Sequence, residues 1–279
     1  MLEVLKNTTY RHLFLAQVIA LIGTGLITIA LALQAYDIAK EQAAQVLGIA
    51  LAIKMIAYIS VAPIASAFAE RLPRKKVLVG LDVIRALTAL CLPFVTQIWQ
   101  IYILIFILQS ASAAFTPTFQ AMIPDVLPIE EEYTNALSLS RLAYDLENII
   151  SPMLAGLLLT VMSYHNLFLG TVVGFIGSAL FVVSAKLPNA KMPEFIGVYN
   201  RIEQGAKIYF RTPRLKALLA LNLAIASASA VVIVNTVVLV QTTFGLTEKA
   251  TTWAFGLFGL GSMLAAFALP KILDKLNDR

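Results

Sequence analysis

Long apolar runs are the feature that most restricts what this sequence can fold into. A bilayer core about 30 Å thick is crossed by a helix of about 20 apolar residues, because a helix satisfies its own backbone hydrogen bonds in lipid. The sequence holds eight such runs, at roughly 13–36, 45–69, 77–96, 98–116, 136–162, 166–185, 215–241 and 251–270. They predict an all-α fold, a polytopic membrane helical bundle. Residues 77–116 are almost continuously apolar, and Pro93, Gln97 and Trp99 place the break there at 96–99.

The overall composition agrees with a lipid environment. Hydrophobic residues make up 59% of the chain and charged residues 13%, against roughly 45–50% and about 25% in soluble domains. The single cysteine, Cys91, lies in an apolar run, and the two histidines, His12 and His165, are far apart. We therefore expect no disulfide framework, no metal site and no cofactor. The spans show no catalytic dyad at helical spacing, and the chain has no phosphate-binding Gly-x-x-x-x-Gly-Lys-Ser/Thr motif, so we expect no enzyme.

The positions of lysine and arginine predict the orientation in the membrane, because these residues accumulate on the cytoplasmic side. With the N-terminus inside, 17 of the 21 basic residues fall on the inner side. Two, Lys40 and Lys249, fall outside, and two, Lys54 and Arg85, lie within spans. Both ends of the chain are then cytoplasmic. The excess of positive charge is explained by topology, so we expect no nucleic acid partner.

The chain divides into two unequal parts around its longest polar stretch. We predict a six-span N-terminal half at 1–186, a cytoplasmic central loop at 187–214 and a partial second half with two spans at 215–279. The loop after the second span, 70–75, and the residues 274–279 after the eighth are both acid–base–Leu stretches. This weak repeat suggests two parallel six-span halves, the second of which stops after two spans.

Several motifs resemble signatures of the major facilitator superfamily. The family carries Asp-Arg-x-Gly-Arg-Arg between spans two and three, which corresponds here to Glu70, Arg71, Arg74, Lys75 and the residues between them. Its exporter branch, which includes macrolide and siderophore efflux proteins, often continues with an acid and an arginine in span three, as do Asp82 and Arg85. The span-five signature Gly-Pro-x-x-Gly-Gly is similar to residues 151–156, where the matching kink motif is Ser151, Pro152 and Gly156.

The resemblance implies a C-terminally truncated member of this family. It implies a secondary-active transporter, an antiporter that couples proton entry to efflux of amphipathic small molecules of the drug or siderophore type, in a bacterial-type cytoplasmic membrane. Its partners would be the lipid bilayer, the small-molecule substrate and protons, and we expect a monomer. The alternative is a truncated, transport-inactive membrane remnant of such a transporter.

The resemblance also suggests a gating network near the inner surface. Its members would be Glu70, Arg71, Arg74, Lys75, Asp82 and Arg85. Asp82 and Arg85 are three residues apart and share a helix face. Such a network would bias the equilibrium between inward and outward states. The alternative is a static salt-bridge cluster that only fixes topology.

Charged residues inside spans are costly and usually face the bundle interior or a cavity. Candidates for coupling or substrate binding are Lys54, Asp145, Glu147 and Asn148. Lys54 either snorkels to the outer surface or points into the cavity toward an anionic substrate or an acid. Asp145 and Glu147 either carry protons or lie near the inner headgroups, solvated or paired. Glu147 shares a helix face with Ser151, and Pro152 is expected to bend span five.

Overall fold

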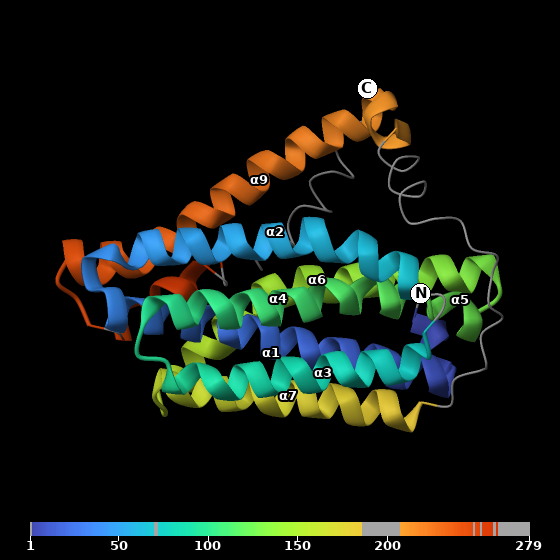
Figure 1. Cartoon of the computed structure of the whole chain (residues 1–279), viewed down its shortest axis with the longest axis horizontal. Coiled ribbons are helices and arrows are strands. Elements are labelled where there is room, and N and C mark those ends of the chain that lie inside the picture. Colours follow the sequence, from blue (N-terminus) through green and yellow to red (C-terminus); the bar gives the residue numbers. More distant parts are fainter. Residues whose placement is uncertain are drawn as a thin grey trace.

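Long helices that run back and forth build the structure (Figure 1). The computed structural model describes residues 2–69, 72–185, 207–247, 249–251, 253–258 and 261. Its long helices are α1 (Thr8–Ala39), α2 (Ala43–Ala69), α3 (Arg74–Cys91), α4 (Ile98–Gln120), α6 (Glu130–Leu159), α7 (Tyr164–Ser184) and α9 (Pro213–Val238). Short elements between them are η1 (Leu2–Lys6), η2 (Lys40–Gln42), η3 (Leu92–Phe94), α5 (Ile123–Val126) and the π-helical η4 (Leu239–Thr243). The predicted all-α membrane bundle is confirmed.

The described helices follow the predicted spans closely. By length and composition, the stretches able to cross a membrane are Thr8–Ser66, Arg74–Phe94, Ile98–Val126, Tyr164–Ser184 and Pro213–Thr243, the first of which runs through both α1 and α2. In α6 the apolar stretch among the described residues is Ile150–Leu159, and acidic and basic residues lie in the first half of the helix. The predicted last span, 251–270, and the central loop, 187–214, lie largely outside the described residues. The count of eight spans and the domain boundaries stay predictions.

The predicted break at 96–99 is confirmed, and its cause is local. Helix α3 ends at Cys91, and the 3-10 turn η3 with Pro93 in its first turn follows. Helix α4 begins at Ile98, and Gln97 and Gln100 form a reciprocal capping box at its start. The box satisfies backbone N–H groups that the first turn of a helix leaves without partners.

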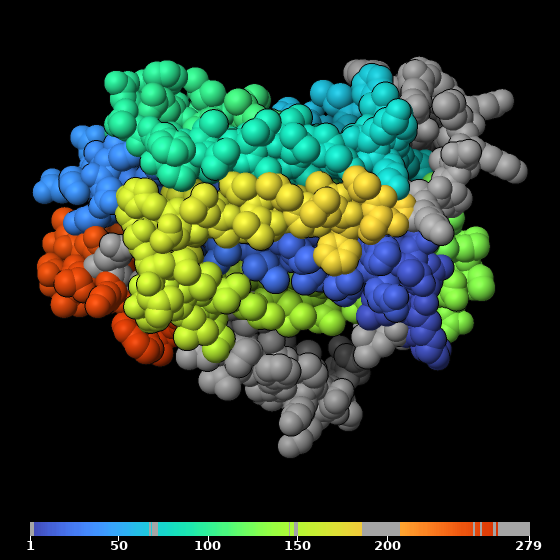
Figure 2. Space-filling view, turned by 90° about the horizontal axis from the view of Figure 1, so that it is seen from below, coloured from blue at the N-terminus to red at the C-terminus, as the bar shows by residue number. Residues whose placement is uncertain are grey.

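Helix α1 lies at the centre of the bundle. It packs against α7, α6, α2 and α9, while α3 packs against α4 and α7, and α2 against α4. Seen from below, α7 lies between α3 and the exposed part of α1 (Figure 2). We call the end where α1 starts the N-terminal end of the bundle and the end where α1 stops the far end.

Glycines allow α1 and α7 to approach closely. A Cβ atom placed on Gly174 would lie 3.1 Å from the carbonyl oxygen of Ile19 and 3.2 Å from the Cα of Gly23. The hydroxyl of Thr171 donates to the carbonyl oxygen of Gly23 at 2.8 Å. Small residues of this kind let helix backbones pack in a membrane, where apolar side chains gain little from leaving lipid.

The apolar core is divided into two clusters. One, toward the N-terminal end, includes Leu78 of α3 and Val182 of α7, and the other, toward the far end, includes Ala86 of α3 and Phe175 of α7. Buried polar side chains lie between the two clusters on four helices: Gln17, Asp82, Arg85, Ser112 and Ser178. We call these five residues the polar layer.

Helix α9 contacts the rest of the bundle mainly near the far end. Val237 is buried in the far-end cluster together with Phe255, and the hydroxyl of Thr242 donates to that of Tyr36 at 3.4 Å. Toward its start α9 diverges from α2 (Figure 1), and most of its residues before 235 are exposed. The two helices therefore enclose an angle that opens toward the N-terminal end.

The close contact of α1 and α7 makes Gly174 intolerant of a side chain. Gly174→Leu should lower the free energy of unfolding by about 1–3 kcal/mol, because the atoms it would meet are backbone atoms that cannot rotate away. Gly80→Leu on α3 is the matched control, since a Cβ there meets nothing within 4 Å. Thermal unfolding of the two variants in detergent measures the difference, and equal melting temperatures would contradict the packing argument.

Candidate functional site

Asp82 and Arg85 form an ion pair inside the bundle. Their side chains are 0% and 4% exposed, and the guanidinium donates to the carboxylate of Asp82 within the same helix. The hydroxyl of Ser178 on α7 donates to the other carboxylate oxygen at 2.7 Å. A buried charge pair is tolerated only when further hydrogen bonds satisfy its remaining polar atoms, and Ser178 supplies one of them.

The guanidinium of Arg85 also lies between two aromatic rings. The centroids of Phe115 on α4 and Phe175 on α7 are 4.2 Å and 4.5 Å from its central carbon. Aromatic faces attract a cation more strongly when water is excluded. Sequence analysis grouped this pair with Glu70 and Arg71, which lie outside the described residues. Its described neighbours belong to α4 and α7.

Arg74 and Lys75 bind the ends of neighbouring helices. Arg74 donates to the carbonyl oxygen of Ala121, the C-cap of α4, at 2.6 Å and forms an ion pair with Asp125 of α5. Lys75 donates to the carbonyl oxygen of Ala185, the C-cap of α7, at 2.8 Å. Cations at these positions satisfy the last carbonyl groups and interact favourably with the helix dipole. Both residues therefore tie the start of α3 to α4, α5 and α7.

Lys54 on α2 and Glu147 on α6 lie within electrostatic range of each other, although they form none of the ion pairs of the described residues. Their charges interact, and both side chains are half-buried. The direction that the side chain of Lys54 takes, which the sequence left open, stays a prediction. The two residues are oppositely charged groups on two different helices, away from the helix ends.

Tyrosines connect the Lys54–Glu147 pair to the polar layer. Tyr58, one turn after Lys54 on α2, interacts electrostatically with Tyr144, Glu147 and Arg85. The hydroxyls of Tyr144 and Thr116 lie 3.1 Å apart. Half-buried charges and hydroxyls in one place can hold the polar part of a small molecule and can exchange a proton with it.

Gly25 on α1 makes room for the face of α6 that carries Glu147. A Cβ atom at Gly25 would lie 1.9 Å from the hydroxyl oxygen of Ser151 and 3.4 Å from Oε1 of Glu147. Glu147 and Ser151 thus share one face, as their spacing predicts. The side chains of Asp145 and Asn148 lie outside the described part of α6, so their predicted roles stay predictions.

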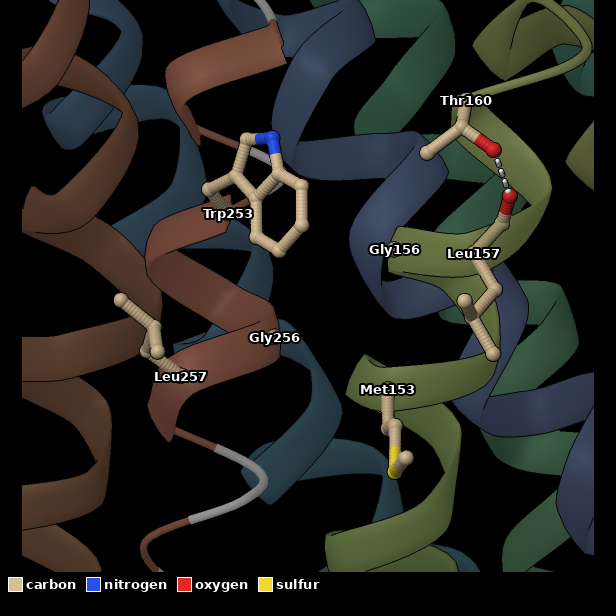
Figure 3. A pocket seen from close by; sticks show the side chains of 7 residues that line it. All are labelled: Met153, Gly156, Leu157, Thr160, Trp253, Gly256 and Leu257. Atoms are coloured by element: carbon tan, nitrogen blue, oxygen red, sulfur yellow. Dashed lines mark hydrogen bonds between the residues drawn. The ribbon is translucent and has the colours of Figure 1, made fainter.

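The kink motif leads to an apolar pocket. Helix α6 continues through Pro152 to Leu159, and Gly156 lines a pocket of about 110 Å³ between α6 and residues 253–257 (Figure 3). Ser151 is buried and faces α1 instead. The residues of the kink motif therefore lie on two faces of α6: Ser151 faces α1, and Gly156 faces the pocket.

Sequence analysis missed several residues around these charges. Tyr58 is four residues after Lys54 and Tyr144 is three before Glu147, so helical spacing could have found both. The residues that contact Arg85 and Asp82 from other helices are Ser178, Phe115 and Phe175. No local sequence pattern predicts these contacts. Asp125 lies in the stretch predicted only as a break between spans.

Comparison with known proteins agrees with this architecture. The family model of the Major Facilitator Superfamily matches residues 13–279. Among solved structures, the nucleoside transporter NupG superposes with a TM-score of 0.72 over 96% of this chain and 68% of that one, at 14% sequence identity. At this identity the likeness concerns the fold alone.

Curated relatives are similar over part of their length. An uncharacterised MFS-type transporter, YfiS, of Bacillus subtilis (strain 168) is 24% identical over 209 residues, which are 73% of this chain and 50% of that protein. Macrolide efflux protein A of Streptococcus pyogenes is 27% identical over 177 residues, 62% of this chain and 43% of that protein. The chain spans about half the length of these relatives. The family match covers nearly all of its residues, and the chain belongs to the Major Facilitator Superfamily.

Proposed function

We propose that the protein is a secondary-active transporter that exports amphipathic small molecules in exchange for protons. It would work as a monomer in a bacterial-type plasma membrane. The N-terminal end of the bundle would face the cytoplasm, as the distribution of basic residues predicts. The single observation that supports the proposal is that two half-buried, oppositely charged side chains, Lys54 of α2 and Glu147 of α6, lie within electrostatic range of each other inside the bundle. The similarity to macrolide efflux protein A supports efflux and a drug-type substrate.

The proton would be exchanged at Glu147. In the charged state the carboxylate of Glu147 pairs with Lys54 across the two helices. Protonation removes the negative charge and with it the attraction to Lys54, so a substrate and a proton can compete for the same place. The neighbouring hydroxyls of Tyr58 and Tyr144 offer hydrogen bonds in either state.

Access to this place would be from the N-terminal end of the bundle. The angle between α2 and α9 opens there, while Val237, Phe255 and the Tyr36–Thr242 hydrogen bond hold the far end together. Under the predicted orientation this arrangement is the inward-facing one. The gating role of Glu70, Arg71, Arg74, Lys75, Asp82 and Arg85 stays a prediction.

Replacing the acid should uncouple transport from protons. Glu147→Gln cannot lose a proton, so its export rate should no longer rise with an imposed proton gradient, whereas Glu131→Gln, at an exposed acid on the same helix, should behave like the parent. Export of a labelled macrolide and of a lipophilic cationic dye is followed in vesicles that contain the full-length gene product. A Glu147→Gln variant with the parent's dependence on the gradient would rule out coupling through this residue.

Variants of the buried Asp82–Arg85 pair can distinguish a gating role from that of a static salt-bridge cluster. Asp82→Leu leaves the charge of Arg85 buried without its partner and should cost about 3–5 kcal/mol of folding free energy. Asp82→Leu combined with Arg85→Met removes both charges and should recover most of that loss. Unfolding in detergent measures stability, and export by the double variant tests function. A stable double variant that exports at the parent rate would exclude gating by this pair, and a stable double variant without export would support it.

A further inference from the structure

An apolar pocket of about 110 Å³ lies between the second half of α6 and the helical residues 253–258 (Figure 3). Seven residues line it: Met153, Gly156, Leu157, Thr160, Trp253, Gly256 and Leu257. Thr160 carries the only hydroxyl among the seven, and it donates to the carbonyl oxygen of Leu157 at 2.6 Å. The other side-chain donor among the seven is the indole N–H of Trp253, and none of the seven side chains is charged, so a charged group would lose its hydration there with little compensation.

The size of the pocket suits a single ring. An engineered apolar protein cavity of roughly 150 Å³ stays dry and binds benzene; this pocket is smaller and is open on one side, where Trp253 and Leu257 are 66% and 63% exposed. Trp253 lies on one wall and Met153 on the other, and the backbone of Gly256 lies between them in the view (Figure 3). An indole stacks with aromatic rings, and a thioether sulfur makes favourable contacts with them. Both groups favour an aromatic occupant over a saturated chain.

We propose that this pocket is a binding site for one uncharged aromatic ring, separate from the Lys54–Glu147 pair. Glu147 faces Gly25 on α1, whereas the pocket lies between α6 and residues 253–257. Because its walls come from α6 and from a segment that follows α9 in the chain, a bound ring bridges the two parts. Binding therefore favours the arrangement in which the far end is held together. The site requires neither transport nor proton coupling.

Gly256 provides a direct way to fill the pocket. A Cβ atom at Gly256 meets nothing within 4 Å, so a larger side chain can occupy the space without displacing a neighbour. Gly48 on α2 is the matched control, because a Cβ there also meets nothing within 4 Å and Gly48 does not line the pocket. Met153→Phe fills the same space from the opposite wall, and it replaces Gly256→Leu as the test variant if that variant fails to fold.

Quenching of Trp253 fluorescence tests the site. The chain has two tryptophans, Trp99 and Trp253, so the full chain with Trp99→Phe reports on Trp253 alone. In nanodiscs, bromobenzene should quench this fluorescence saturably, beyond the linear quenching by probe dissolved in lipid. Gly256→Leu should weaken the saturable part about tenfold or more, and Gly48→Leu should leave it unchanged.

Two results would overturn the proposal. Quenching that rises only linearly in the parent and in both glycine variants would show that no site exists. Saturable quenching by 1-bromododecane at equal or lower concentration than by bromobenzene would assign the pocket to a lipid chain instead of an aromatic ring. Because the measurement uses binding alone, a failed transport experiment leaves its outcome unaffected.

Discussion

The buried Asp82–Arg85 pair is the interaction on which the arrangement of the bundle depends. Removing two charges from water is costly, and the pair is stable only with the partners that surround it. Ser178 and Phe175 come from α7 and Phe115 from α4. The charges on α3 therefore fix the position of two neighbouring helices. In a membrane, where apolar side chains gain little by packing against each other, such a polar contact is worth relatively more.

The pair also explains why the core has two clusters. A layer of polar side chains separates the apolar residues near the N-terminal end from those near the far end. Tyr58 of α2 and Tyr144 of α6 extend the electrostatic interactions of this layer toward Lys54 and Glu147. The fully buried charges hold the bundle together, whereas Lys54 and Glu147 are only half-buried. The charges inside the bundle thus differ in how far they are buried.

Much of the helical framework could be predicted from the sequence, because each span must be apolar and each break must contain turn formers or charges. Gln97 marks the start of α4 for this reason. The burial of Asp82 and Arg85 was predictable from the cost of charges in lipid. Their partners were not, since Phe115 and Ser178 lie 30 and 96 positions away along the chain from Arg85 and Asp82 respectively. For Lys54 the sequence allows two directions, because the choice between them depends on helices that lie far away along the chain.

Helix α1 links the packing of the bundle to its candidate site. On one side Gly23 lies against Gly174 of α7, and on another Gly25 lies against Ser151 of α6. A side chain at Gly25 would displace Ser151, and because Glu147 is one helical turn away on the same face, it would move as well. The place of the carboxylate opposite Lys54 is therefore set by how closely two backbones approach. Gly25 thus sets the distance between the charges of Glu147 and Lys54, and their attraction operates at that distance.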